Sequence, residues 1–211
     1  MRTKGNTSRC FMVILFFMVG AVSCATVPEL KINYRLPPKS DALHSMRVFI
    51  GYEDERASKD LMGRGAQKEY RNFTGNITYS LAREDEPGFR RGAYKVPSLF
   101  KDVFKRRLNY LGAEVVSNKE YSDVELRIVL KELLLDLVKE DLVKKKWTAT
   151  MSYEAQIIQN GEVLAKQMIS AQGERAKIVG KADADKVMSE VFEDLVNSLD
   201  VPRLFQRARL L

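Results

Sequence analysis

The chain has 211 residues, of which 45% are hydrophobic and 30% charged, and its net charge is +7. This length allows one ordinary domain with additional segments and makes two large domains improbable. A single histidine and two cysteines exclude most catalytic and metal-binding sites that are built from those residue types. The composition is that of a chain that can build a hydrophobic core, and it argues against general disorder.

The N-terminus has the pattern of an export signal. Residues 1–9 contain three basic residues and no acid, and Cys10–Val22 is apolar almost throughout. A basic start, a short apolar run and an exit of small residues predict a signal peptide over residues 1–23. The apolar run is shorter than the roughly 20 residues that a membrane-spanning helix needs. Removing the signal lowers the net charge from +7 to +4.

Cys24 makes the export prediction more specific. Ala21-Val22-Ser23-Cys24 resembles the bacterial lipobox, although Ala21 departs from the usual leucine. The resemblance implies cleavage between Ser23 and Cys24, with diacylglycerol joined to the Cys24 thiol. Ordinary signal cleavage after Ser23 is the alternative, because Ala-x-Ser also suits that peptidase. Since Cys10 lies inside the signal, Cys24 is the one exported thiol, and lipidation explains an unpaired cysteine there.

The lipidated N-terminus and a flexible tether are expected to occupy residues 24–45. Pro28 and Pro37-Pro38 lie there among scattered apolar residues, a pattern that favours an extended chain. His44 closes the stretch, where a histidine is more often a solvated polar residue than a ligand. A single α+β domain is then expected over residues 46–201, followed by a basic tail over 202–211. This tail either docks on the domain or lies on an anionic surface as a short amphipathic helix.

The first half of the domain combines one clear strand with one clear helix. Met46–Tyr52 is β-branched and aromatic, and a run of charges follows it. Residues 57–95 remain undecided between a long loop and irregular structure that contains a short strand at Asn76–Leu81. Helical spacing of apolar residues predicts a helix over residues 96–111, which Gly112 ends. A short strand, Ala113–Val116, comes next.

The second half predicts long strands and a final helix. Apolar residues alternate from Val124 to Leu130, and the phase then shifts, which predicts a bulge near Lys131-Glu132. Trp147–Ile157 alternates cleanly, so one face that includes Trp147 is expected in the core. Asn160-Gly161 indicates a tight hairpin to a strand over residues 162–172. With a helix over residues 183–199, the expected fold class is α+β: a largely antiparallel four- to five-stranded sheet with two helices packed on one face.

No catalytic, cofactor-binding or metal-ligating residue is expected. The sequence contains no P-loop, GxSxG or CxxC motif. Carboxylates on the predicted strands are expected mostly on a solvated face; they include Glu125, Glu132, Asp136 and Glu154. Lys144-Lys145-Lys146 lies between two long strands, so it is read as a charged hairpin end, with contact to lipid headgroups or to an envelope polymer as the alternative.

With these elements in place, the chain resembles the YajG-like family of bacterial lipoproteins. The resemblance is carried by Cys24, by Met46–Ile50 with the following Asp54-Glu55-Arg56, by Asn109-Tyr110-Leu111-Gly112, by Gln159-Asn160-Gly161 and by the final amphipathic helix. It implies an uncharacterised lipoprotein anchored in the outer membrane of a Gram-negative bacterium and facing the periplasm, without enzymatic activity. It also implies a recurring Asp-x-Arg feature at Asp54 and Arg56, for which local pairing at a strand end is the simpler explanation.

Three functions compete on the sequence alone. The first is a lipid-anchored binding or scaffolding module of the cell envelope, whose partner is an envelope protein or an anionic envelope polymer. The second is an accessory lipoprotein of an ABC-type lipid transport system. The third, an envelope hydrolase, lacks a nucleophile or metal set. Ala25 is not the aspartate that retains lipoproteins in the inner membrane of enteric bacteria, so the outer membrane is the expected location. Nucleic acid is not expected as a partner.

Overall fold

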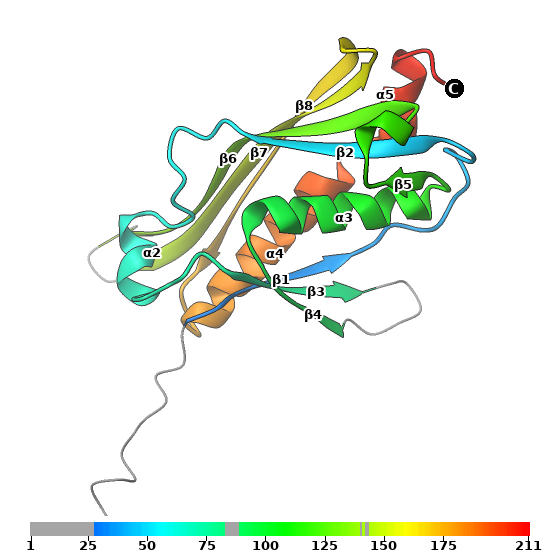
Figure 1. Cartoon of the computed structure of the whole chain (residues 1–211). Coiled ribbons are helices and arrows are strands. Elements are labelled where there is room, and N and C mark those ends of the chain that lie inside the picture. Colours follow the sequence, from blue (N-terminus) through cyan, green and yellow to red (C-terminus); the bar gives the residue numbers. More distant parts are fainter. Residues whose placement is uncertain (1–27, 83–88, 140, 142–143) are drawn as a thin grey trace, which may run out of the picture.

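The computed structural model describes residues 28–82, 89–139, 141 and 144–211. These residues form two β-sheets with helices packed against them (Figure 1). In chain order the elements are β1 (Leu30–Arg35), β2 (Arg47–Asp54), α2 (Arg64–Glu69), β3 (Ile77–Ala82), β4 (Phe89–Tyr94), α3 (Val96–Tyr110), β5 (Glu114–Val116), a 3-10 helix (Lys119–Tyr121), β6 (Val124–Lys139), β7 (Lys145–Gln159), β8 (Glu162–Ala176), α4 (Lys181–Asn197) and α5 (Val201–Arg207).

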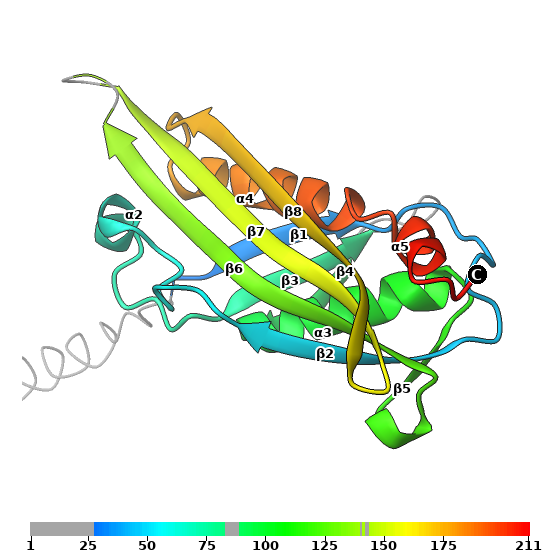
Figure 2. The same cartoon turned by 90° about the horizontal axis from the view of Figure 1, so that it is seen from above.

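The larger sheet has the strand order β5-β2-β6-β7-β8. β2 pairs in parallel with both β5 and β6, whereas β6, β7 and β8 pair antiparallel. The three long strands lie side by side (Figure 2). Because successive strand residues point to opposite faces, one face collects the apolar side chains. The buried members of this inner face include Leu126, Ile128, Leu130, Trp147, Met151, Tyr153 and Ile157.

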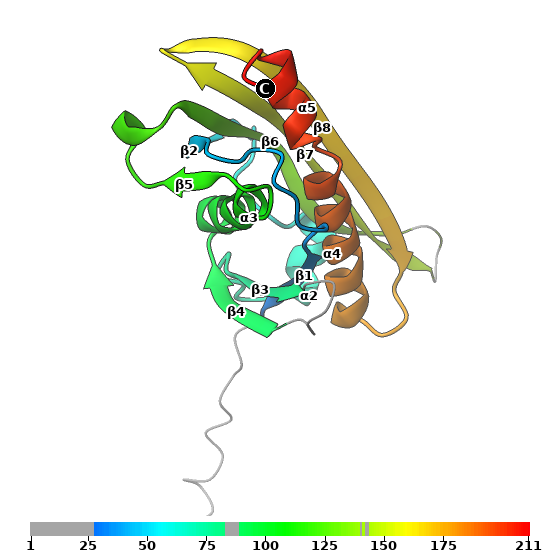
Figure 3. The same ribbon diagram turned by 90° about the vertical axis from the view of Figure 1, so that its right-hand side faces the viewer.

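Helices α3 and α4 pack on the inner face of the larger sheet, and a second sheet lies on the far side of α3 (Figure 3). The rings of Phe100 and Phe104 on α3 meet Tyr153 on β7, with centroids 6.3 Å and 5.6 Å apart. Phe192 on α4 contacts Phe100 at 5.7 Å and Tyr34 on β1 at 6.0 Å. This aromatic cluster joins both sheets and both long helices into one core.

The α+β class is confirmed, but the expected antiparallel sheet is only partly matched. Two of the four pairings in the larger sheet are parallel, and a second sheet has the order β1-β3-β4. Parallel pairing needs a crossover connection, and the chain between β2 and β6 is long enough to supply one. Within the larger sheet, only β6, β7 and β8 are neighbours in both sequence and space, so only there does chain order predict the pairing.

The structure departs from the expected tether at Leu30–Arg35, which forms strand β1. Leu30, Ile32 and Tyr34 are buried, and β1 pairs in parallel with β3. The opposite edge of β1 meets α4, because the Lys31 N–H donates to Asp185 at 2.9 Å and the Asn33 N–H donates to the Ser189 hydroxyl at 3.0 Å. These side chains satisfy edge groups that would otherwise be open to another strand.

Several local predictions are confirmed. The register of β6 and β7 shifts between Leu130 and Glu132, where the bulge was expected. Asn160 and Gly161 have φ angles of 52° and 86°, as a tight hairpin turn requires, and Gly112 ends α3 with a φ of 86°. The basic tail begins as α5, with Leu204 and Phe205 buried, and thus docks on the domain.

Candidate functional site

The larger sheet is interrupted where β2 ends. The Glu55 N–H still donates to Leu130 O at 2.9 Å, and the chain then leaves the sheet as a loop over residues 55–60. Pairing with β6 resumes farther along, because Leu135 N donates to Leu61 O and Gly63 N donates to Leu135 O, both at 2.9 Å. The bulge of β6 lies at the same level as this 55–60 loop. The pairing between β2 and β6 is therefore broken at one place, where β2 leaves the sheet and β6 bulges.

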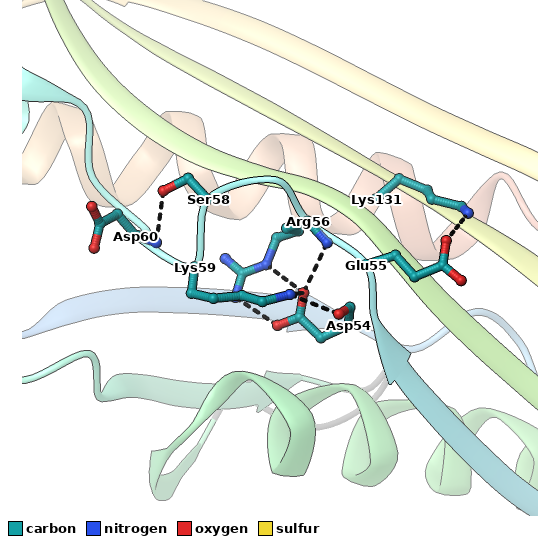
Figure 4. Close-up of polar contacts among 7 residues, drawn as sticks. All are labelled: Asp54, Glu55, Arg56, Ser58, Lys59, Asp60 and Lys131. Atoms are coloured by element: carbon teal, nitrogen blue, oxygen red, sulfur yellow. Dashed lines mark hydrogen bonds and ion pairs between the residues drawn. The ribbon is translucent and has the colours of Figure 1, made fainter.

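Asp54 and Arg56 hold the loop in a defined shape (Figure 4). The Arg56 guanidinium donates from Nε to Asp54 Oδ1 at 3.0 Å and from Nη2 to Asp54 Oδ2 at 2.9 Å. Lys59 Nζ reaches Asp54 Oδ1 at 3.0 Å and the Asp54 carbonyl at 2.7 Å. The local pairing expected for this Asp-x-Arg sequence is confirmed.

These contacts fix the charge of Asp54. The hydrogen bond from Arg56, followed by that from Lys59, holds the pKa of Asp54 well below its usual range, although burial acts in the opposite direction. Both carboxylate oxygens accept hydrogen bonds from cations. A carboxylate whose pKa is lowered in this way stays ionised at neutral pH, so it is a poor general acid and a weak proton acceptor. Asp54 thus serves as a structural anchor for the loop.

Arg56 retains one unused donor. The residue is only 7% exposed, and its Nη1 is buried without a hydrogen-bond partner among the residues that the structure describes. A buried guanidinium donor of this kind costs free energy unless an acceptor satisfies it. Glu55, next to it, faces solvent and forms an ion pair with Lys131 on the β6 bulge, which ties the start of the loop to β6 (Figure 4).

Two hollows flank the 55–60 loop. One has a volume of about 290 Å³ and is lined by Arg56, Ala57, Ser58, Asp60 and Lys131–Leu134. The other has a volume of about 450 Å³ and is lined by residues from Lys59 to Met62 and by Gln67, Tyr70 and Asn72–Gly75. Asp60 belongs to both. Apolar and polar side chains line both hollows, a combination that suits non-covalent binding.

A second charged cluster lies on the outer face of the larger sheet. Glu125 is only 4% exposed, which corrects the expectation of a solvated carboxylate. Burial raises its pKa, but hydrogen bonds from Arg127 and Lys119 outweigh this, and the pKa of Glu125 is lowered. A side chain at position 51 would collide with it, since a Cβ there would lie 2.2 Å from Glu125 Oε1. Gly51 therefore leaves the space that the carboxylate fills.

The remaining sequence-predicted sites lie apart from the 55–60 loop. Ser23 and Cys24, the expected cleavage and lipidation residues, fall outside the described residues. Lys144 and Lys145 are exposed at the start of β7, while Lys146 pairs with Glu174 at 2.7 Å. His44 is exposed in a turn before β2. Nothing in the sequence locates the 290 Å³ hollow, because its two walls come from segments about 70 residues apart. The 450 Å³ hollow is lined by residues between Lys59 and Gly75 and lies in the region that the sequence left undecided.

Two further features bear on the class of protein. Within residues 28–82, 89–139, 141 and 144–211, no helix is both long and apolar enough to cross a membrane. In the same residues, no group of three or more His, Cys, Asp or Glu side chains is arranged to hold a metal ion.

Comparison with known proteins adds remote structural similarity. No protein-family model matches the sequence, the YajG-like family included, and no curated protein matches it. Solved structures resemble the fold at low sequence identity. A Xanthomonas campestris protein of the family model DUF330 is 12% identical, with a TM-score of 0.46 over 80% of this chain and 92% of its own. A minor lipoprotein from Acinetobacter baumannii is 9% identical, with a TM-score of 0.40 over 82% and 94%. The hypothetical protein CT253 from Chlamydia trachomatis is 8% identical, with a TM-score of 0.40 over 77% and 97%. All three scores lie below 0.5, so function is inferred below from this chain's own residues.

Proposed function

We propose that the protein is a lipid-anchored lipoprotein of the outer membrane that faces the periplasm and acts as a non-catalytic binding or scaffolding module. The anchoring part rests on the lipobox-like Ala21–Cys24 and on Ala25 after it. The binding part rests on one observation, the opened sheet edge where the 55–60 loop separates two hollows. The partner is an envelope protein or an anionic envelope polymer that seats a segment at this loop.

The charged groups at the loop support binding over catalysis. Asp54 forms ion pairs with Arg56 and Lys59, and Glu55 forms an ion pair with Lys131. The other groups that line the 290 Å³ hollow include the Ser58 hydroxyl, the carboxylates of Asp60 and Glu132, the side chains of Leu133 and Leu134, and Arg56, whose buried Nη1 donor has no partner among the described residues. A carbonyl or carboxylate oxygen of a bound segment is the group that would satisfy this donor.

Intact-mass measurement tests the anchor. Wild-type protein extracted from membranes is expected to begin at Cys24 and to carry acyl chains, while Cys24→Ser leaves a precursor or releases the protein into soluble fractions. Ala25→Asp is the matched control for location, because it should shift the lipidated protein from the outer to the inner membrane. An unmodified residue 24 in the wild type would show that the chain is not a lipoprotein.

Site-specific crosslinking tests the binding site. A photoreactive amino acid at position 58 is expected to capture a partner in intact cells. The same amino acid at position 162, where the exposed Glu162 begins β8, should capture none. Recovery of a transport permease from Ser58 would favour the ABC-transport accessory role over scaffolding. Equal yields from both positions would remove the loop as a binding site. A triple variant tests the lysine cluster: Lys144→Glu, Lys145→Glu and Lys146→Glu. If this variant captures the same amount of partner as the wild type, the cluster is a solvated hairpin end and not a binding site.

A further inference from the structure

One end of the molecule displays two aliphatic side chains to solvent. Ile178 and Val179, between β8 and α4, are 83% and 70% exposed, the highest values among the large hydrophobic residues of the described chain. Fully exposed aliphatic side chains on a soluble surface are ordinary when isolated, but an adjacent pair on a projecting loop provides apolar area that water solvates poorly.

The loop that carries this pair is held in place at several points. Both amides of Ile178 and Val179 donate to Asp183 Oδ2, at 2.7 Å and 2.5 Å, and these bonds hold the pKa of Asp183 below its usual range. The Trp147 indole N–H donates to Gly180 O at 2.9 Å. Lys177 N donates to Lys145 O at 2.9 Å. The pair is therefore presented on a fixed loop, so that little conformational entropy would be lost on insertion into another phase.

Lysines surround the pair. Lys144 and Lys145 are exposed at the start of β7, next to Lys177 through the backbone bond just described. Lys181 follows the loop and lies over the Tyr70 ring at 5.0 Å, leaving its charge at the surface. The acids at this end include Glu69, which pairs with Lys177 at 2.6 Å, Glu174, which pairs with Lys146 at 2.7 Å, Asp183, whose Oδ2 accepts the two loop amides, and Asp141. Exposed apolar tips beside the exposed Lys144, Lys145 and Lys181 match an anionic bilayer surface.

The N-terminal end of the domain lies at the same end of the molecule. The Lys31 N–H at the start of β1 donates to Asp185, one half-turn of α4 beyond Asp183. Figures 1 and 3 both place the start of β1 and the N-terminus of α4 at one end. Cys24 precedes Pro28 by four residues, which span at most about 14 Å when extended. A lipid on Cys24 would hold this end against the bilayer.

We propose that Ile178 and Val179, ringed by Lys144, Lys145, Lys177 and Lys181, form a membrane-docking surface that inserts into the anionic bilayer holding the lipid of Cys24. This inference rests on the lipid anchoring proposed above. It specifies orientation: the β8–α4 loop faces the membrane, and the β7–β8 hairpin at Asn160-Gly161 faces away. The two ends of the 15-residue strand β8 are about 45 Å apart.

Depth-dependent fluorescence tests the orientation. In the mature lipidated chain Cys24 carries acyl chains, so Ile178→Cys introduces the one reactive thiol for an environment-sensitive dye. In vesicles of phosphatidylethanolamine and phosphatidylglycerol, this label should shift to the blue and be quenched by nitroxide lipids. Val163→Cys is the matched control, because Val163 is an aliphatic residue that is 50% exposed and lies at the opposite end of β8 from Ile178. Equal quenching at both positions, or none at position 178, would overturn the proposal. A blue shift without vesicles would mean that protein covers the pair, and would also overturn it.

Vesicle binding separates docking from anchoring. The mature chain with Cys24→Ala carries no lipid, and it should still sediment with phosphatidylglycerol-containing vesicles but not with phosphatidylcholine vesicles. Ile178→Asp with Val179→Asp should lower this binding at least about tenfold, while Val163→Asp with Leu164→Asp should leave it unchanged. If wild-type Cys24 proves unlipidated, anchoring fails, yet this measurement still decides docking. Equal binding by both double variants would refute docking even in a lipidated protein.

Discussion

Arg56 and Asp54 form a pair in which each charge depends on the other. Asp54→Asn leaves the buried guanidinium without its carboxylate, and we expect unfolding free energy to fall by about 3 kcal/mol. Urea denaturation at neutral pH measures this loss. Asp123→Asn is the control, because its partner Arg47 is exposed and that pair should add nothing measurable. Equal losses in the two variants would show that burial of Arg56 does not matter.

The same pair predicts a pH dependence. The pKa of folded Asp54 lies below the unfolded value of about 3.9. The pairing therefore adds stability at pH values above the unfolded pKa, and this contribution is lost as pH falls toward the folded pKa. Unfolding midpoints of the wild type should decline below about pH 4, and Asp54→Asn should show a shallower decline. Parallel curves would assign the acid sensitivity to other carboxylates.

Trp147 is confirmed as core, since it is fully buried and its indole N–H is hydrogen-bonded to Gly180 O. Trp147→Ala removes a large side chain that the surrounding residues cannot replace, so we expect a loss of about 3–5 kcal/mol. Circular dichroism during urea unfolding provides the measurement. Trp147→Phe keeps most of the volume and loses the hydrogen bond, so it should cost clearly less; an equal cost would place the effect in the indole N–H.

At the scale of elements, α2 depends on Gly65 and Asp136. Asp136 Oδ1 accepts hydrogen bonds from Gly65 N at 2.9 Å and Ala66 N at 3.1 Å. A Cβ at position 65 would lie 1.9 Å from the Leu137 carbonyl oxygen. Gly65→Ala should push α2 off β6 and destabilise the protein by about 1–3 kcal/mol. The exposed Lys68→Ala on the same helix is the control. Unchanged stability in Gly65→Ala would mean that α2 packs more loosely than the geometry indicates.

The length of each sequence pattern decides whether the corresponding element can be predicted. The helical spacing of α3 and α4 and the alternation of β6 and β7 run for many residues, so each signal accumulates. β1 alternates Leu30, Ile32 and Tyr34 with polar residues over only six positions, and the nearby prolines outweigh that short pattern. In β4, Gly92 and adjacent arginines conceal the strand.

The candidate site divides in the same way. Pairing of Asp54 with Arg56 is local in sequence and could be expected at a strand end. The 290 Å³ hollow could not be expected from the sequence. Its second wall, Lys131–Leu134, reaches Arg56 only because β6 bulges beside the point where β2 ends. Register between distant strands sets that geometry, and no single segment encodes it.

At the scale of the whole molecule, the C-terminal helices complete the first strand. A chain that ends at residue 179 lacks α4 and α5, so it exposes Leu30, Ile32 and Tyr34 and leaves the Lys31 and Asn33 amides without partners. We expect this truncated chain to be degraded rapidly in limited proteolysis. Deletion of the half-exposed Leu211 alone should preserve resistance. A protease-resistant truncated chain would show that the two sheets fold without α4.

For the export proposed above, the placement of β1 against α4 also sets an order of folding events. A chain that crosses a membrane from its N-terminus delivers Leu30–Arg35 early and Lys181–Asn197 almost last. Contacts between such distant segments close late, because loop closure must precede the stabilisation that they bring. The first strand therefore stays open for nearly the whole passage, and a modifying enzyme that acts on Cys24 would meet a flexible, unfolded neighbourhood.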